Sequence, residues 1–468
     1  MGEPGMSDQE IREEAAYALG VEACLWGRPL VESAVTFAAA LKAGATRVSG
    51  LRYFDDLKTA DDRFVVTPNN VTIDGYGAAD LRTEPVVVSV PALAEDRWYI
   101  VQIGDYYDEI VHNIGGYSGP EPGLYVITGP DYQGHVPQAM TEVNVRTRFA
   151  VTALRVLVRG DADLPGARAV QRGFRVMPLS AFEQYGLSYI DPGGSQQDTI
   201  PPFEPEAPAE LQPLEYLGFA MRQFLSASDG VSDTFIRQLR AIGLTVTGGF
   251  DWRNLDKGSK HGLARAIGVA EQITDNAYYG AATRVNGWRY TLATGRAGHN
   301  FALRAAFAKY LVGANVPEQL TYPNTAVDAD GDPLTGDNRY VLRFEAGQAP
   351  PVSVFWNMSM YDAGELFISN DFGRYSIGST TDGLKAGPDG SITIVIQHQQ
   401  PADTANWLPA PASGSFNLTM RMYGAQTPVL DGTYRLPPVT KSPVEPEQAP
   451  RQRARAPGGR RKASRHPD

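Results

Sequence analysis

The chain has 468 residues, of which 43% are hydrophobic and 20% are charged, and its formal net charge is -11. This length predicts two or three domains with ample capacity for hydrophobic cores. The negative charge disfavours nucleic acid as a partner of the folded body, because phosphate contacts require clustered Lys and Arg. A single cysteine, Cys24, excludes an internal disulfide and a zinc site built from several thiolates.

The N-terminal residues and the hydropathy pattern indicate a soluble, cytoplasmic protein. A secretion signal begins with basic residues and continues with an apolar core, whereas this chain begins with acids. These acids are Glu3, Asp8, Glu10, Glu13 and Glu14. No stretch approaches about eighteen uninterrupted apolar residues, so we expect neither a spanning helix nor a membrane partner.

The first predicted element is a pair of helices within residues 1–50. Ser7 and Glu10 have the spacing of a capping box, and helical periodicity follows as far as Cys24. Pro29 suits the first turn of a second helix, which we expect to end near Gly44.

The rest of the chain alternates between β-rich and helical texture. Residues 51–184 contain short β-branched and aromatic runs, residues 214–320 show helical periodicity again, and residues 321–441 return to strands. The proline-rich residues 185–213 predict an extended surface linker. Segregated runs of helices and strands favour an α+β fold, rich in β structure, over a doubly wound α/β fold. Strands of this spacing suggest barrels or sandwiches.

The last segment, residues 442–468, has seven Arg and Lys against three acids, which leaves an acidic body with a basic tail. We expect this tail to be disordered, because it has no apolar core residue. Contact with RNA or acidic surfaces is an alternative role for it.

A search for catalytic and cofactor motifs is largely negative. The chain lacks a phosphate-binding loop, a His-Glu-x-x-His metal helix and a Gly-x-Ser-x-Gly nucleophile elbow, so we expect no cofactor. The six histidines form no helical metal pair, and we expect no metal site. Asp328, Asp330 and Asp332 resemble the opening of a calcium loop, but a polar hairpin turn is the favoured interpretation.

Aromatic and polar residues gather at the ends of predicted strands and suggest a ligand site. Planar rings stack on ring faces, while amide and guanidinium donors hold hydroxyl or carboxylate oxygens. The candidate ligand-binding residues are Asn69, Asn70, Tyr106, Trp356, Asn357, Tyr361, Tyr375 and Trp407. The candidate catalytic residues are Asp105, Asp362 and Arg374. The alternative is structural, because buried aromatics and an arginine that binds loop carbonyls are common in β-rich cores.

Several motifs resemble an uncharacterised bacterial family that pairs the domains of unknown function 1254 and 1214. In the N-terminal half these are VTPNNVT at 66–72, TEPVVVSVP at 83–91, WYIVQIGD at 98–105, DADLPGARAV at 161–170 and FRVMPL at 174–179. In the C-terminal half they are GAN at 313–315, PPVSVFWNMSMYD at 350–362, NDFGRYSIG at 370–378, DGS at 389–391 and NWLPAP at 406–411.

The resemblance covers roughly residues 20–440. It implies two β-barrel or jelly-roll-like domains bridged by helices, and it implies no particular reaction. The chain departs from the family pattern at Val71, where an Asp is usual, and Asp74 is the nearby substitute.

Two hypotheses of function follow. The first is a protein that binds a small polar or carbohydrate-like molecule without catalysis, and the second is a hydrolase- or lyase-type enzyme that uses Asp and Arg in acid–base and electrostatic chemistry. Whether the chain is an enzyme stays open at this point. We also expect a homo-oligomer, because β-rich domains expose sheet edges that need to be covered.

Overall fold

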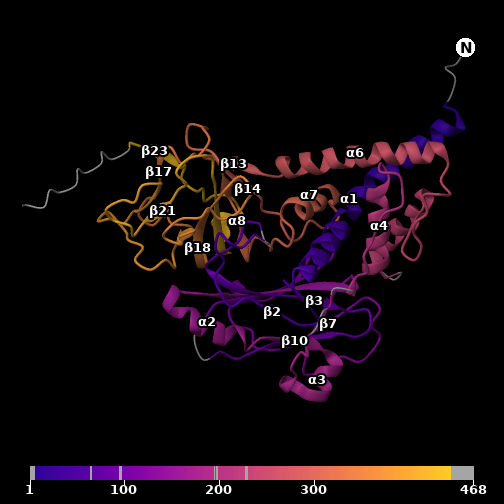
Figure 1. The fold of residues 1–468 in the computed structure, drawn as a ribbon, viewed down its shortest axis with the longest axis horizontal. Coiled ribbons are helices and arrows are strands. Elements are labelled where there is room, and N and C mark those ends of the chain that lie inside the picture. The colour runs from indigo at the N-terminus through magenta and orange to yellow at the C-terminus, as the bar shows by residue number, and fades with distance from the viewer. Residues whose placement is uncertain are drawn as a thin grey trace, which may run out of the picture.

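The computed structural model describes residues 6–63, 66–93, 97–193, 196, 199–226 and 230–443. The described part is an α+β protein with three regions (Figure 1). The N-terminal β-rich domain lies at the bottom of the view, a group of long helices lies above it on the right, and the C-terminal β-rich domain lies above it on the left, beside the helices. The predicted tail falls almost entirely outside the described residues.

The N-terminus is one continuous helix, α1 (Asp8–Lys42), and the predicted pair of helices is wrong. The capping box is present, because Ser7 Oγ accepts from the backbone of Glu10 and the Glu10 carboxylate accepts from the backbone of Ser7. Pro29 lies inside the helix, where it removes one backbone hydrogen bond. Trp26 and Leu30 are fully buried on either side of it, and this packing outweighs the lost bond.

The N-terminal domain consists of two sheets that pack face to face. The first sheet contains β1 (Arg47–Val48), β2 (Arg52–Tyr53), β3 (Thr72–Asp80), β5 (Tyr99–Asp105), β6 (Ile110–Gly115) and β9 (Phe149–Leu157). The second sheet contains β4 (Val86–Val90), β7 (Gly123–Thr128), β8 (Thr141–Asn144) and β10 (Arg175–Pro178). Alternate residues such as Ile103 and Leu154 fill the space between the sheets. The opposite face of the first sheet therefore remains for α1 and the pocket described below.

Two short helices, α2 (Leu164–Gln171) and α3 (Leu179–Tyr185), complete the N-terminal domain. In the proline-rich segment that follows, Ile200 is buried, and Phe203 stacks on Phe219 with ring centroids 4.5 Å apart. The described part of this segment thus contributes to the helical core.

The helical region contains α4 (Gln212–Phe224), α5 (Gly230–Gln238), α6 (Lys257–Gly280) and α7 (Phe301–Tyr310), with a short hairpin of β11 (Leu244–Thr245) and β12 (Gly249–Phe250). These helices confirm the periodicity predicted for residues 214–320. α1 and α6 pack so closely at Gly262 that a Cβ on this residue would lie 2.1 Å from the backbone oxygen of Glu13. Among the described helices, none combines the length and apolar content needed to cross a membrane.

The C-terminal domain also consists of two sheets with a core between them. The larger sheet contains β13 (Thr283–Val285), β14 (Trp288–Tyr290), β15 (Leu320–Thr321), β16 (Asn324–Thr325), β18 (Val352–Tyr361), β19 (Ser376–Gly378) and β22 (Asn417–Ala425). The smaller sheet contains β17 (Arg339–Phe344), β20 (Ile392–Gln397), β21 (Trp407–Pro409) and β23 (Thr440–Ser442), and the short helix α8 (Thr427–Leu430) follows β22. Over the described residues, no sheet of either domain closes on itself, so both domains consist of open sheets.

The two β-rich domains contact each other through an aromatic cluster. The Trp98 ring meets the edges of Phe355 and Tyr423 at centroid distances of 5.4 and 5.2 Å. Phe355 and Tyr423 in turn stack at 4.0 Å. Because all three rings are buried, the domains share a small hydrophobic core.

Candidate functional site

A pocket of about 260 Å³ lies between the first sheet and the C-terminal half of α1. Strands β3, β5 and β9 form its floor, and Phe37 and Ala40 of α1 form the opposite wall. The turn after β5 and the loop after α7, at Val312 and Gly313, also line the pocket and are hydrogen-bonded to each other. Thus the N-terminal domain and the helical region build the pocket together.

Arg155 of β9 supplies a cation to the floor of this pocket. Its Nη1 donates to Gln102 Oε1 at 3.2 Å, and Gln102 Nε2 donates to the backbone oxygen of Gly313 at 2.8 Å. Among the described residues, no carboxylate lies within ion-pair distance of the Arg155 guanidinium. The arginine therefore keeps donors that an anionic ligand can use.

A second cation beside Arg155 is already neutralised. The Lys58 ammonium donates to the Asp74 carboxylate at 2.8 Å, and both side chains are almost fully buried. Tyr76, which lines the pocket, donates its hydroxyl to the same carboxylate at 2.9 Å. Burial raises the pKa of Asp74, but the charges of Lys58 and Arg155 outweigh this effect and hold the pKa below its usual range. With Asp74 ionised, Lys58, Asp74 and Arg155 together carry one net positive charge.

The turn after β5 brings carboxylates to the opposite end of the pocket. Asp105 is tied to the protein, because its Oδ2 accepts from Arg146 at 2.6 and 2.9 Å and its Oδ1 accepts from the backbone of Tyr107 and Glu109. Asp108 has a positive φ of 60°, a conformation that costs free energy in most residues. The turn thus holds Asp108 in a strained conformation at the pocket wall.

The Asp108 carboxyl has a pKa suited to proton transfer near neutral pH. Burial is the largest cause that raises this pKa, and the charges of Asp105 and Glu109 also raise it, whereas the hydrogen bond from the Gly313 backbone and the charge of Arg304 lower it; the net result is a pKa of about 7. Burial also raises the pKa of Glu109, whose Oε1 accepts from the backbone of Gly298 at 2.8 Å. A carboxyl that titrates near pH 7 beside a cavity is a candidate general acid or base.

Two of the sequence-predicted residues, Asp105 and Tyr106, lie in the lining of this pocket. The Tyr106 ring is fully buried against Phe37 and Phe149, and its hydroxyl has no hydrogen-bond partner among the described residues. The other candidate ligand-binding residues of the N-terminal half, Asn69 and Asn70, do not line this pocket.

Asn69 and Asn70 belong to a polar cluster between the two β-rich domains. Asn69 Nδ2 donates to the Tyr423 hydroxyl at 2.8 Å, and Asn70 Oδ1 accepts from Ser376 Oγ at 2.7 Å. The loop they occupy also accepts a hydrogen bond at the Pro68 oxygen from the Tyr361 hydroxyl, at 2.7 Å. The structure therefore brings the two predicted asparagines to the predicted strand that carries Tyr361.

A buried arginine is at the centre of this interdomain cluster. Arg421 donates to the Tyr361 hydroxyl and the Thr67 oxygen, both at 2.6 Å, and to Ser359 Oγ at 3.1 Å. Asn357 lies directly across from Arg421 in the ladder, and its buried Oδ1 has no partner among the described residues. The cluster connects loop 67–70 to β18 and β22.

The remaining predicted residues do not join one surface. Arg374 Nη1 donates to the backbone oxygens of Thr404 and Trp407, at 2.5 and 2.9 Å. Trp407 is buried and donates Nε1 to the Gln397 oxygen at 2.8 Å, whereas Trp356 is buried inside the C-terminal core against Phe344.

Tyr375 stacks on Phe367 at a centroid distance of 4.8 Å. Asp362 Oδ1 accepts from the backbone of Gly364 and Leu366, at 2.8 and 3.0 Å. These side chains, like Arg374, bind the backbone or neighbouring rings of their own domain. Their roles in binding or catalysis stay predictions.

The sequence analysis missed four pocket residues, Tyr76, Gln102, Asp108 and Arg155. A signal for Arg155 existed, because it is the one charged residue of a mostly apolar strand pattern. Asp108 and Gln102 carried no such signal, because their partner is Gly313, more than two hundred residues away.

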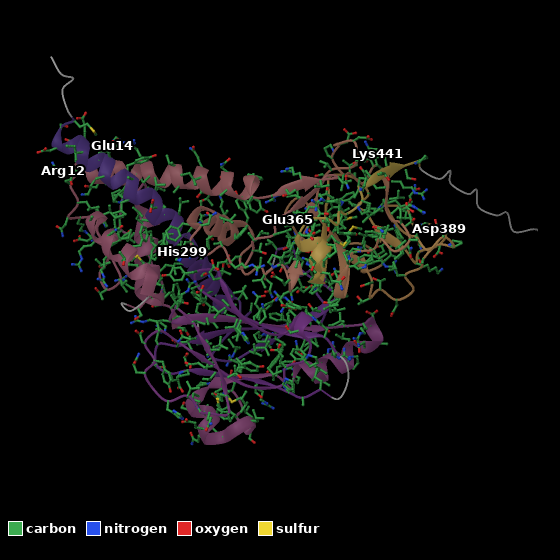
Figure 2. All side chains as sticks on the ribbon, turned by 180° about the vertical axis from the view of Figure 1, so that it is seen from behind. Arg12, Glu14, His299, Glu365, Asp389 and Lys441 are labelled. Atoms are coloured by element: carbon green, nitrogen blue, oxygen red, sulfur yellow. The ribbon has the colours of Figure 1, made fainter. Side chains whose placement is uncertain are left out.

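The acidic loop at Asp328 is closed by a lysine. The Asp328 Oδ1 accepts from the backbone of Asp330 and Asp332, both at 3.0 Å, and Lys441 forms ion pairs with Asp328 and Asp332. Lys441 lies on the side of the C-terminal domain that faces away from the N-terminal domain (Figure 2). In the described part of the chain, His, Cys, Asp and Glu side chains form no group of three that could hold a metal.

Comparison with known proteins finds two family matches. Residues 49–178 match the family DUF1254, and residues 319–427 match the family DUF1214; both families are described as proteins of unknown function. No curated protein matches the chain.

Two solved structures are similar to this chain, and the first of them shares its fold. The VPA0106 protein from Vibrio parahaemolyticus has 24% sequence identity and a TM-score of 0.70, over 92% of this chain and 100% of that chain. A putative uncharacterized protein from Burkholderia cenocepacia has 13% identity and a TM-score of 0.41, over 90% of this chain and 94% of that chain.

Proposed function

This chain belongs to the family that pairs DUF1254 with DUF1214, and we propose that it binds a small polar organic molecule in the pocket between α1 and the first sheet. The observation that carries this proposal is the state of Arg155. Its guanidinium lines a cavity, donates to one amide oxygen, and has no carboxylate partner among the described residues. A buried cation is costly unless it is paired, so a ligand that completes its hydrogen bonds binds favourably.

A library of small metabolites tests this proposal by thermal shift. We expect at least one polar compound to raise the melting temperature of the wild-type chain, because a ligand that binds only the folded state stabilises it. The control is Val151→Trp, since Val151 lines the pocket and is 37% exposed, so an indole can occupy the cavity without entering the core. Stabilisation that persists in Val151→Trp would place the ligand elsewhere and contradict the proposal.

Catalysis is the second candidate function, and the observation that favours it is the pKa of about 7 at Asp108. A group with this pKa exchanges protons efficiently at neutral pH, which suits hydrolase- or lyase-type chemistry. The test incubates the wild-type chain with each bound compound and follows the compound by mass spectrometry. Turnover that Asp108→Asn abolishes while binding persists would favour the enzyme, whereas an unchanged compound would favour binding alone.

The cytoplasmic location, the homo-oligomer and the jelly-roll-like topology of the two domains stay predictions. Open sheet edges support self-association in particular, since β6 ends the path of the first sheet and β8 ends that of the second. Sedimentation at micromolar concentration tests it, and a purely monomeric chain would contradict it.

A further inference from the structure

The floor of the pocket is arranged in rows that the strand register defines. Asp74 pairs with Arg155 across β3 and β9, Tyr76 pairs with Ala153, and Ala78 pairs with Val151. Because alternate residues of a strand share a face, all three pairs face α1. The first row is charged, the second carries one hydroxyl, and the third is apolar.

Strand β5 continues the two rows that line the pocket most closely. Gln102 pairs with Ala153 and adds an amide to the second row, and Gly104 pairs with Val151 and adds no side chain to the third. Rows two residues apart are separated by about 6.5 Å. The polarity of the floor therefore falls from the Arg155 end to the Val151 end within about 13 Å.

The opposite wall supplies the apolar groups Phe37, Ala40 and Ala45 and, among its described residues, no charged side chain. Ser33, Thr36 and Thr46 line the cavity on the same side and add hydroxyl groups. With about 260 Å³, the cavity is smaller than the pockets of about 300 Å³ and more that hold drug-sized molecules. A ligand that fits has one anionic end at Arg155 and a compact apolar body over Val151 and Phe37, which is short enough to end before the carboxyl groups of the turn after β5.

The charge at the polar end distinguishes between anions. Lys58 is paired with Asp74, so the excess positive charge comes from Arg155 alone. One carboxylate balances one charge and accepts two parallel hydrogen bonds from a guanidinium. A phosphate monoester carries about 1.5 to 2 negative charges near pH 7 and would leave buried charge unbalanced.

The geometry points to a small monocarboxylic acid as the ligand, with its carboxylate on Arg155 and its single-ring or short aliphatic body against Val151, Ala153 and Phe37. This inference rests on the proposed function and narrows it to one chemical class.

The experiment is a binding panel measured by ligand-observed NMR with the full chain. The panel contains benzoate, phenylacetate, butyrate and hexanoate, the primary amide of each, and phenyl phosphate. We expect one or more of the acids to bind, and the matching amide and phenyl phosphate to bind about tenfold more weakly or not at all.

Variants assign the bound acid to the pocket. Arg155→Met should weaken its binding by about 10- to 100-fold, because the charge-assisted contact is lost. Arg155→Lys keeps the charge without the planar fork and should have an intermediate affinity. The matched control is Arg343→Met, which removes an exposed arginine of the C-terminal domain and should leave binding unchanged.

The other outcomes show whether the carboxylic-acid class, the pocket or both are wrong. Amides or phenyl phosphate that bind as well as the acids, and lose binding in Val151→Trp, would overturn the carboxylate class and leave the pocket in place. Acid binding that survives both Arg155→Met and Val151→Trp would overturn the site. The carboxylic-acid class alone would be overturned by one combination of results. In it, no panel member binds, but a compound of the metabolite library binds the wild-type chain and does not bind Val151→Trp. No binding by any compound would overturn both proposals.

Discussion

The N-terminal pocket and the C-terminal domain both contain arginines, and these arginines differ in how many hydrogen-bond acceptors the protein itself supplies to them. In the C-terminal domain Arg421 donates to three oxygens and Arg374 to two, and each acceptor belongs to the protein. In the pocket, Arg155 donates to one amide oxygen beside an open cavity. The arginines of the two regions therefore differ in the number of their protein partners and not in residue type, and this difference is the basis for proposing Arg155 as the ligand-binding arginine.

The C-terminal aromatic residues support the same comparison. Trp356 and Trp407 are buried, and the Trp407 indole nitrogen already donates to a backbone oxygen. Their rings contribute to packing with no free face shown toward a cavity. Tyr76 also has a partner, but its ring lines the pocket.

The largest expected effect on stability is that of Arg421→Met. The change leaves Thr67, Ser359 and Tyr361 without their buried donor, and we expect a loss of about 3 kcal/mol in the free energy of unfolding. Urea unfolding measures it, with Arg343→Met as the exposed control. A loss below about 1 kcal/mol would break the comparison, because Arg421 would then be no more structural than a surface arginine.

Asp108→Asn should change how stability depends on pH. Unfolded, Asp108 ionises near pH 4, whereas the folded chain keeps this proton until about pH 7. Between these pH values the folded state binds more protons than the unfolded state. The contribution of Asp108 to the free energy of unfolding therefore falls as the pH rises from about 4 to 7 and is constant above 7.

The asparagine variant removes this titration. It keeps an oxygen for the Gly313 backbone and tolerates positive φ, so we expect it to be more stable than the wild-type chain at pH 8, by about 2 kcal/mol, and little changed near pH 4. Urea unfolding at the two pH values measures the difference. An equal effect of the substitution at both values would show that Asp108 titrates normally.

Arg374→Ala tests directly whether ligand binds in the N-terminal pocket or at Arg374 in the C-terminal domain. Because Arg374 binds the backbone oxygens of Thr404 and Trp407 and is only half-buried, its removal should cost about 1–2 kcal/mol of stability. Binding of any ligand at the N-terminal pocket should be unchanged. Loss of binding with intact stability would instead support the predicted C-terminal site and reverse the comparison.

The smallest expected effect concerns the C-terminal end of the described chain. Truncation after Pro443 should leave the melting temperature unchanged, because residues 444–468 have the composition of a chain without a core. Truncation after Thr440 also removes Lys441, its ion pairs with Asp328 and Asp332, and part of β23, and should cost about 1 kcal/mol. Equal melting temperatures for both truncations would show that Lys441 contributes nothing.

Local sequence rules were reliable wherever local interactions decide the structure. The capping box at Ser7 and Glu10 predicted the start of α1, and hydrophobic periodicity predicted the helices between residues 214 and 320. The order of motifs along the chain predicted the pairing of the two domains. The same rules misread Pro29 as a helix start, because burial of Trp26 and Leu30 on both sides outweighs the cost of one missing hydrogen bond.

The sequence by itself determined the α+β class and the two β-rich regions. Only the tertiary structure decided which polar groups find their hydrogen-bond partners within the protein. Arg155 stands among apolar neighbours in its strand, and Arg374 stands in a polar, glycine-containing loop. In the fold, the backbone oxygens of Thr404 and Trp407 accept from Arg374, whereas Arg155 donates to one amide oxygen and lines a pocket. Hydrogen-bond completion depends on contacts between residues far apart in the chain, and a linear pattern of residue types does not encode those contacts.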